Sequence, residues 1–93
     1  MSQQALGLIE CKGLIASFEA ADAALKAANV TYKGQHRVGN GLVALLFEGD
    51  VSAVKAAIDA GVAAGGRLGQ IVSSSVIARP HEDTTKLWDG LNS

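Results

Sequence analysis

The chain has little of what marks secreted, membrane-spanning or nucleic-acid-binding proteins. It contains one cysteine, Cys11, so no disulfide can form within the chain. Eight basic and nine acidic residues give a formal net charge of −1, which argues against nucleic acid as the main partner because such binders carry a clear basic excess. No apolar run reaches the roughly 20 residues of a membrane helix, and residues 1–13 lack the basic and apolar regions of a secretory signal. We therefore expect a cytoplasmic protein with neither a membrane nor a nucleic-acid partner.

Aromatic residues are also scarce, whereas small residues are abundant. Aromatics make up 4% of the chain, while 48% of it is hydrophobic and 11 residues are glycine. Small side chains let backbones approach closely and leave little room for a deep ligand cavity. Because 93 residues form one domain with a core of limited size, our hypothesis is that the domain completes its burial against copies of itself.

The order of apolar runs and turn signals predicts the fold. An α+β, ferredoxin-like split β-α-β domain is indicated, with a four-stranded antiparallel sheet, two main helices and a short C-terminal helix. Strands are expected at residues 5–11, 30–38, 42–48 and 69–79, and helices at 16–29 and 52–65. Asp50 or Ser52 is the expected cap of the second helix, and Gly65-Gly66 its end.

Helical spacing assigns faces to both helices. In the first helix Phe18, Ala21, Leu25 and Ala28 form an apolar face. A polar stripe of Glu19, Asp22, Lys26 and Asn29 lies beside it, with Asp22 and Lys26 placed as an i, i+4 ion pair. In the second helix Val54, Ile58 and Val62 are predicted to face the core.

The stretch "RVGNGLV" at residues 37–43 carries the strongest local signal. Gly39-x-Gly41-x-x-Ala44 matches the letters of a dinucleotide-binding fingerprint, but that motif needs a following helix whose N-terminus meets phosphate. The residues after Gly41 instead have the pattern of a strand. Gly39-Asn40-Gly41 is therefore predicted to be a hairpin turn, in which glycine and asparagine accept positive φ.

The remaining chemical candidates assemble no active site. His36 and His81 lie far apart without metal-ligand spacing. Cys11 is interpreted as a small core residue, and Ser73-Ser74-Ser75 lacks the glycine-flanked elbow of a serine hydrolase. We predict no catalytic residue, no metal, no cofactor and no enzymatic activity.

Four segments together carry a family resemblance. "ALGLIECKGL", "AADAALKAANV", "RVGNGLVALLFEGDVSAVKAAIDAG" and "VIARPH", in this order, resemble the bacterial microcompartment shell proteins of the single-domain, hexamer-forming type. The resemblance runs from about Ala5 to Asp83. It implies one shell domain over residues 1–93, with a core at about 5–83 and a C-terminal tail at 84–93.

The resemblance also implies a function and site residues. Proteins of this family form six-fold rings with a central pore, and the rings tile into the facets of a protein shell. The family's pore loop, Lys-Ile-Gly-x-Gly, corresponds to Arg37, Val38, Gly39, Asn40 and Gly41. The basic loop suggests a pore for small polar or anionic metabolites. Ring-to-ring contacts are expected at Lys26 with Asn29 beside it, and at Arg79 with His81 close by.

The expected partners are the chain itself, other shell proteins and the targeting peptides of enclosed enzymes, and the expected location is the microcompartment shell in the cytoplasm. Leu87, Trp88 and Leu91 of the tail either pack onto the domain, which we favour, or bind a targeting helix. Three alternatives stay open at this point. Lys26 can pair only with Asp22 on a solvated face, and the chain can be a small ferredoxin-like ligand-binding regulator or a small enzyme with sites at its ring interfaces.

Overall fold

A computed structural model describes residues 4–78 and contains six regular elements. They are β1 (Gln4–Lys12), α1 (Leu14–Ala27), β2 (Thr31–Gly39), β3 (Leu42–Asp50), α2 (Val51–Gly66) and β4 (Gln70–Ala78). The predicted order of strands and helices is confirmed, and α1 begins two residues before the predicted position 16. The predicted C-terminal helix, Arg79 and His81 lie outside the described residues.

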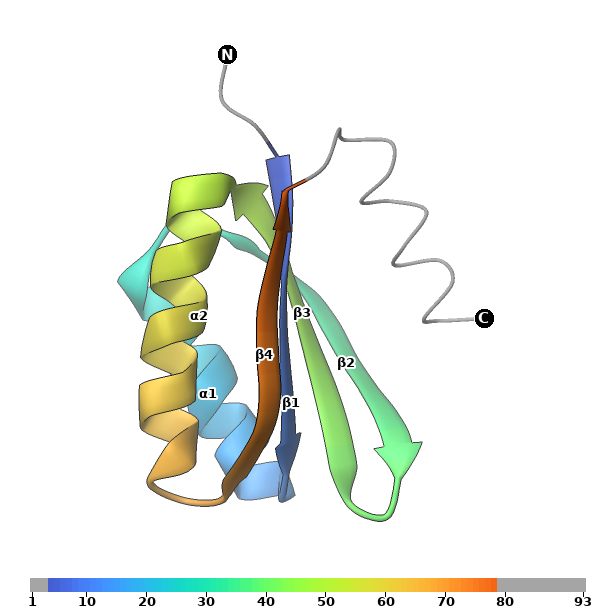
Figure 1. Cartoon of the computed structure of the whole chain (residues 1–93). Coiled ribbons are helices and arrows are strands. Elements are labelled where there is room, and N and C mark those ends of the chain that lie inside the picture. Colours follow the sequence, from blue (N-terminus) through green and yellow to red (C-terminus); the bar gives the residue numbers. More distant parts are fainter. Residues whose placement is uncertain (1–3, 79–93) are drawn as a thin grey trace.

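The four strands form one antiparallel sheet in the order β2-β3-β1-β4. Both helices cover the same face of this sheet (Figure 1). β1 and β3 are the central strands, while β2 and β4 are the two edges. This is the predicted ferredoxin-like arrangement, and it places the α2–β4 connection and the β2–β3 hairpin at the same end of the domain (Figure 1).

The core lies between the sheet and the helices. Side chains alternate between the two faces of a strand, and the odd-numbered positions of β1 and β3 point to the helices. The core cluster comprises Ala5, Ile9, Val43, Leu45 and Phe47 from the sheet, Ala20 and Ala24 from α1, and Val54, Ala57 and Ile58 from α2. Val62 is partly buried against this cluster, so the predicted core face of the second helix is confirmed.

The apolar face predicted for the first helix is correct only in part. α1 is buried through Ala16, Ala20 and Ala24, whereas Phe18 is 57% and Leu25 is 43% exposed. The reason lies in the opposite helix, where a Cβ added at Gly61 would come within 2.9 Å of the Ala20 carbonyl oxygen. Only small residues fit where the helices approach this closely, and the large side chains of α1 are left on its flank.

The start of α2 also differs from the prediction. Asp50 occupies the N-cap position, but its side chain makes no capping hydrogen bond to the helix backbone. Instead the Ser52 hydroxyl donates to Asp50 Oδ2 over 2.9 Å. The end of α2 at Gly66 agrees with the sequence. The Arg67 N–H donates to the Ala64 carbonyl and the Leu68 N–H to the Gly65 carbonyl.

Candidate functional site

The hairpin between β2 and β3 has the geometry that its sequence predicts. Gly39 pairs with Leu42 across the hairpin, which leaves Asn40 and Gly41 as the turn. The φ angles are 98° at Gly39, 54° at Asn40 and 76° at Gly41. A turn with two positive φ angles matches the twist of the flanking strands and strongly prefers Asn-Gly. The hairpin is confirmed, and a strand follows it where a dinucleotide motif needs a helix.

This turn stands at one end of the domain and is tied to the start of α1. The Gly13 N–H donates to the Gly41 carbonyl oxygen over 3.3 Å. A Cβ added at Gly39 or Gly41 would meet no atom of the described residues within 4 Å apart from the adjacent residues. These two glycines are therefore required by their backbone angles rather than by lack of space. All residues from 37 to 41 are exposed.

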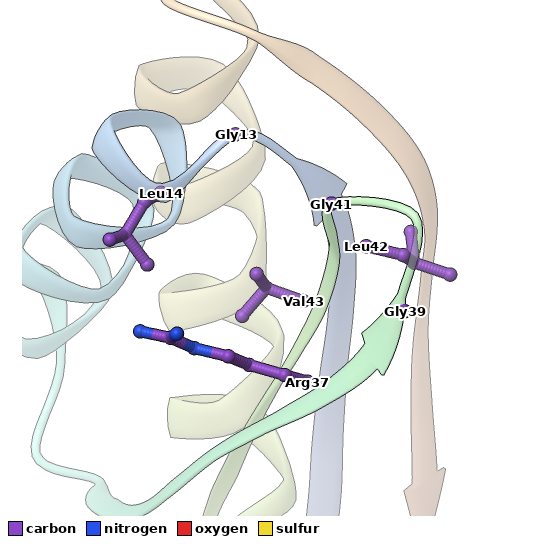
Figure 2. Close-up of a pocket in the computed structure, with 7 residues that line it drawn as sticks. All are labelled: Gly13, Leu14, Arg37, Gly39, Gly41, Leu42 and Val43. Carbon is purple, nitrogen blue, oxygen red and sulfur yellow. The ribbon is translucent and has the colours of Figure 1, made fainter.

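A depression of about 310 Å³ lies beside the turn, between the hairpin and α1. Its lining consists of Gly13, Leu14, Arg37, Gly39, Gly41, Leu42 and Val43. In Figure 2 the Arg37 side chain extends from β2 toward Leu14 rather than toward the tip of the turn. Arg37 pairs with the core residue Val43, so its charge lies on the helix-covered side of the hairpin, and the alternation of side chains places His36 on the other side.

The sequence did not indicate that Gly13 and Leu14 belong to this site. Gly13 has a φ of 101°, which starts α1 directly beneath the turn. The predicted strand order could have indicated that both residues lie at this site. In the ferredoxin-like strand order the end of β1 pairs with the start of β3, as Lys12 does with Leu42, so the β1–α1 connection must lie beside the hairpin.

Of the predicted edge residues, Lys26 and Asn29 are described, and both are exposed near the other end of α1. Lys26 Nζ lies 3.0 Å from Asp22 Oδ2. The hydrogen bond and the charge of Asp22 raise the pKa of Lys26. The predicted ion pair is confirmed, while the role of both residues in ring-to-ring contacts stays a prediction.

The other residues singled out in the sequence lie apart from the turn. Cys11 is buried in β1, and burial raises the pKa of its thiol, which agrees with the interpretation as a small core residue. Ser73, Ser74 and Ser75 are exposed on β4, and the Ser73 hydroxyl donates to Glu10 Oε1 over 2.6 Å.

Residues 4–78 contain neither a metal-binding cluster nor a helix that could span a membrane. No three or more His, Cys, Asp or Glu side chains within these residues are grouped so that they could hold a metal ion. Neither α1 nor α2, the two helices in this range, has the length and apolar character needed to cross a membrane.

The sequence and the fold both match one family. The model of the BMC domain family matches residues 5–80. A solved microcompartment protein from Desulfitobacterium hafniense DCB has the same fold, with a TM-score of 0.74 and 30% sequence identity over 82% of this chain. The chain spans 41% of the length of that protein.

Curated relatives cover almost the whole chain. The bacterial microcompartment shell protein PduA of Citrobacter freundii is 52% identical over 87 residues, which are 94% of each chain. The shell protein EutM of Salmonella typhimurium is 49% identical over 85 residues, 91% of this chain and 88% of its own. The carboxysome shell protein CcmK2 of Synechocystis is 46% identical over 81 residues, 85% of this chain and 79% of its own. The chain belongs to the BMC domain family and is a bacterial microcompartment shell protein, as the sequence motifs indicate.

Proposed function

We propose that this protein forms a cyclic homohexamer in which six copies of the loop Arg37–Gly41 surround a central pore, and that the hexamers tile into the facets of a shell. The observation that carries the proposal is the exposed Gly39-Asn40-Gly41 turn, in which all three φ angles are positive. Within residues 4–78, no atom beyond the adjacent residues lies within 4 Å of a Cβ added at either glycine. Six chain segments can converge on an axis only where bulky side chains are missing.

The chemistry of the turn supports passage of small polar solutes. Backbone groups and the Asn40 amide are exposed at its tip, so they can exchange hydrogen bonds with a solute. Arg37 lies on the helix-covered side of the hairpin, at one mouth of the proposed pore, with His36 next to it in β2. Six guanidinium groups at one mouth make the local potential positive, and at physiological salt this potential extends over a Debye length of about 8 Å. Anionic and neutral metabolites are thereby favoured over cations.

Ion permeation through a reconstituted layer tests the pore. We expect a matched anion to permeate faster than a cation of the same size, and Arg37→Ala to reduce this preference. Lys33→Ala is the matched control, because it removes one positive charge from the same strand at a residue whose ammonium lies 3.9 Å from Glu48 Oε1. Equal permeation of both ions through the wild-type layer would contradict the proposed selectivity.

We further propose that hexamers meet edge to edge through Lys26 and Asn29, together with Arg79 and His81. A lysine can lay its methylene stem along a neighbour while its ammonium finds an acceptor, and arginine offers a rigid fork of donors to backbone carbonyls. Lys26→Ala and Arg79→Ala are expected to leave hexamers intact and to raise the protein concentration at which sheets form. Lys55→Ala, at an exposed lysine of α2, is the control.

The proposed role is structural rather than catalytic, with the protein located in a microcompartment shell within the cytoplasm. Its partners are further copies of itself, other shell proteins and the targeting peptides of enclosed enzymes. Native mass spectrometry and electron microscopy of the purified protein test this role. A hexamer mass with flat sheets, tubes or closed shells is expected. Small discrete oligomers that bind a nucleotide would favour the ligand-binding regulator instead.

A further inference from the structure

A row of side chains crosses the sheet near the turn, on the face opposite to α1 and α2 (Figure 1). Each strand contributes one residue to this row, in the order of the strands: His36, Ala44, Glu10 and Ser73. Residues that stand directly opposite one another in neighbouring strands point to the same face of a sheet. His36 is thereby separated by the thickness of the sheet from Arg37, its neighbour in the chain, which pairs with the core residue Val43.

The carboxylate in this row is held away from the histidine. The Ser73 hydroxyl donates to Glu10 Oε1 over 2.6 Å, which draws the carboxylate toward β4. Adjacent strands lie about 4.8 Å apart, so the backbones at His36 and Glu10 are separated by two strand spacings with the small side chain of Ala44 between them. A positive charge on His36 is therefore not cancelled by a contact with Glu10.

The other charged groups described on this face lie beside or beyond the row. Lys12 is exposed at the end of β1, and Lys33 Nζ lies 3.9 Å from Glu48 Oε1 toward the far end of β2. Imidazole is the side chain that ordinarily gains its charge between pH 5 and 8, whereas carboxylic acids, amines and guanidines ordinarily keep theirs. Of the two histidines in the chain, His36 is the one that lies within residues 4–78.

The proposed ring places both His36 and Arg37 around the pore, but at different mouths. His36 is four residues from Asn40 at the tip of the turn, so a rise of about 3.3 Å per residue puts it no more than about 13 Å from the tip. Six copies of His36 then surround the mouth on the sheet side, and six copies of Arg37 surround the mouth on the helix side (Figure 2). The charge of arginine is permanent, whereas that of histidine depends on pH.

We propose that His36 makes the selectivity of the pore depend on pH: when it is protonated, six imidazolium groups make the sheet-side mouth positive and strengthen the preference for anions. This inference rests on the proposed ring and pore and adds the regulation of that site. Six unit charges about 13 Å from the axis, in water and screened over a Debye length of about 8 Å, change the ratio of anion to cation permeability about threefold. Arg37 supplies the part of the preference that does not depend on pH.

Reversal potentials across a reconstituted layer in a potassium chloride gradient test the proposal at about pH 8 and about pH 5.5. We expect the chloride-to-potassium permeability ratio of the wild type to rise about threefold at the lower pH. His36→Gln keeps a polar side chain without the titrating group, so its ratio should equal that of the wild type at pH 8 and stay there at both pH values. His36→Lys carries its charge at both pH values and should show the high ratio at both.

His81→Gln is the matched control, because it removes the other histidine of the chain by the same substitution. Its permeability ratio should change with pH as that of the wild type does. Native mass spectrometry and electron microscopy establish beforehand that each variant forms hexamers and a continuous layer. A wild-type ratio that is equal at both pH values, or a pH dependence that persists in His36→Gln or disappears in His81→Gln, overturns the inference.

The same measurements separate this inference from the proposed function. A wild-type protein that forms no hexamer, or a layer through which neither ion passes, rejects the proposed pore itself. An anion preference that Arg37→Ala reduces at pH 8, but that is unchanged in the wild type at pH 5.5, supports the proposed pore and rejects only the role of His36.

Discussion

Replacing Gly61 by alanine tests how closely the two helices approach. A Cβ at this position would lie 2.7 Å from Ile9 Cδ1 and 2.9 Å from the Ala20 carbonyl oxygen. The isoleucine methyl group lies at the end of a side chain and can move. The carbonyl belongs to the backbone of α1, so the methyl group can be accommodated only if the whole helix shifts.

The size of the effect follows from two opposing contributions. An extra methyl group in a well-packed core costs about 1–3 kcal/mol. Alanine is favoured over glycine inside a helix by about 0.5–1 kcal/mol, because glycine loses more backbone freedom on folding. The steric cost is the larger of the two, and we expect Gly61→Ala to lower the free energy of unfolding by about 0.5–2 kcal/mol. For a domain of this size that is a decrease in Tm of about 2–16 °C.

Gly66→Ala is the matched control, because it makes the same change in the same helix. A Cβ at Gly66, the last residue of α2, would meet only Ile71 Cγ1 at 3.8 Å, an ordinary contact. We expect the Gly66→Ala protein to be as stable as the wild type or slightly more so. Thermal unfolding followed by far-UV circular dichroism, at one fixed protein concentration because assembly raises apparent stability, measures both variants. If Gly61→Ala is as stable as Gly66→Ala, the packing argument for the helix interface is wrong.

Three further predictions concern the turn, the buried thiol and the exposed ion pair. Gly41→Ala should lower the free energy of unfolding by about 1–2 kcal/mol, because the φ of 76° at this residue is left-handed. Gly41→Asn should lower it less, because asparagine tolerates this region. Chemical denaturation of both variants measures the difference, and an equal loss of stability in both would contradict the argument. Cys11 is buried and the pKa of its thiol is raised. Its alkylation by iodoacetamide should therefore be at least about a hundredfold slower in the native protein than in urea. Comparable rates would show that β1 opens readily. Since Asp22 raises the pKa of Lys26, the pair's contribution is present at neutral pH and is lost only as the pH rises through that raised pKa. The assembly of hexamers into sheets, measured by light scattering, should therefore not weaken through Lys26 between pH 7 and about pH 9.5. The reasoning is wrong if assembly of the wild type weakens within that range while assembly of Lys26→Ala does not.

Much of the fold could be predicted because local signals and global topology agree. Asn40-Gly41 between two apolar runs specifies a hairpin, and the structure has it. The spacing of Val54 and Ile58 identifies the core face of α2. Cys11 in an apolar run is buried as expected.

The orientation of α1 could not be predicted from the periodicity of large apolar residues. Two apolar rows compete on this helix, one of alanines and one containing Phe18 and Leu25. A hydrophobic pattern favours the row with the larger side chains, but Gly61 and Gly65 on α2 admit only the row with the smaller ones. That preference arises from contacts between distant parts of the chain. The position of Arg37 beside Leu14 likewise depends on how the hairpin and α1 meet.

The backbone of the turn limits which amino acids can stand at its tip. Asn40 has a φ of 54°, a conformation that asparagine, aspartate and glycine adopt at little cost and that β-branched residues avoid. Gly39 and Gly41 on either side also have positive φ angles, which glycine adopts without strain, and the space around them is open. Aspartate or glycine can thus replace asparagine at this one position while the rest of the domain keeps its shape. Related chains can therefore differ in the chemical group at the tip of the turn through a single codon.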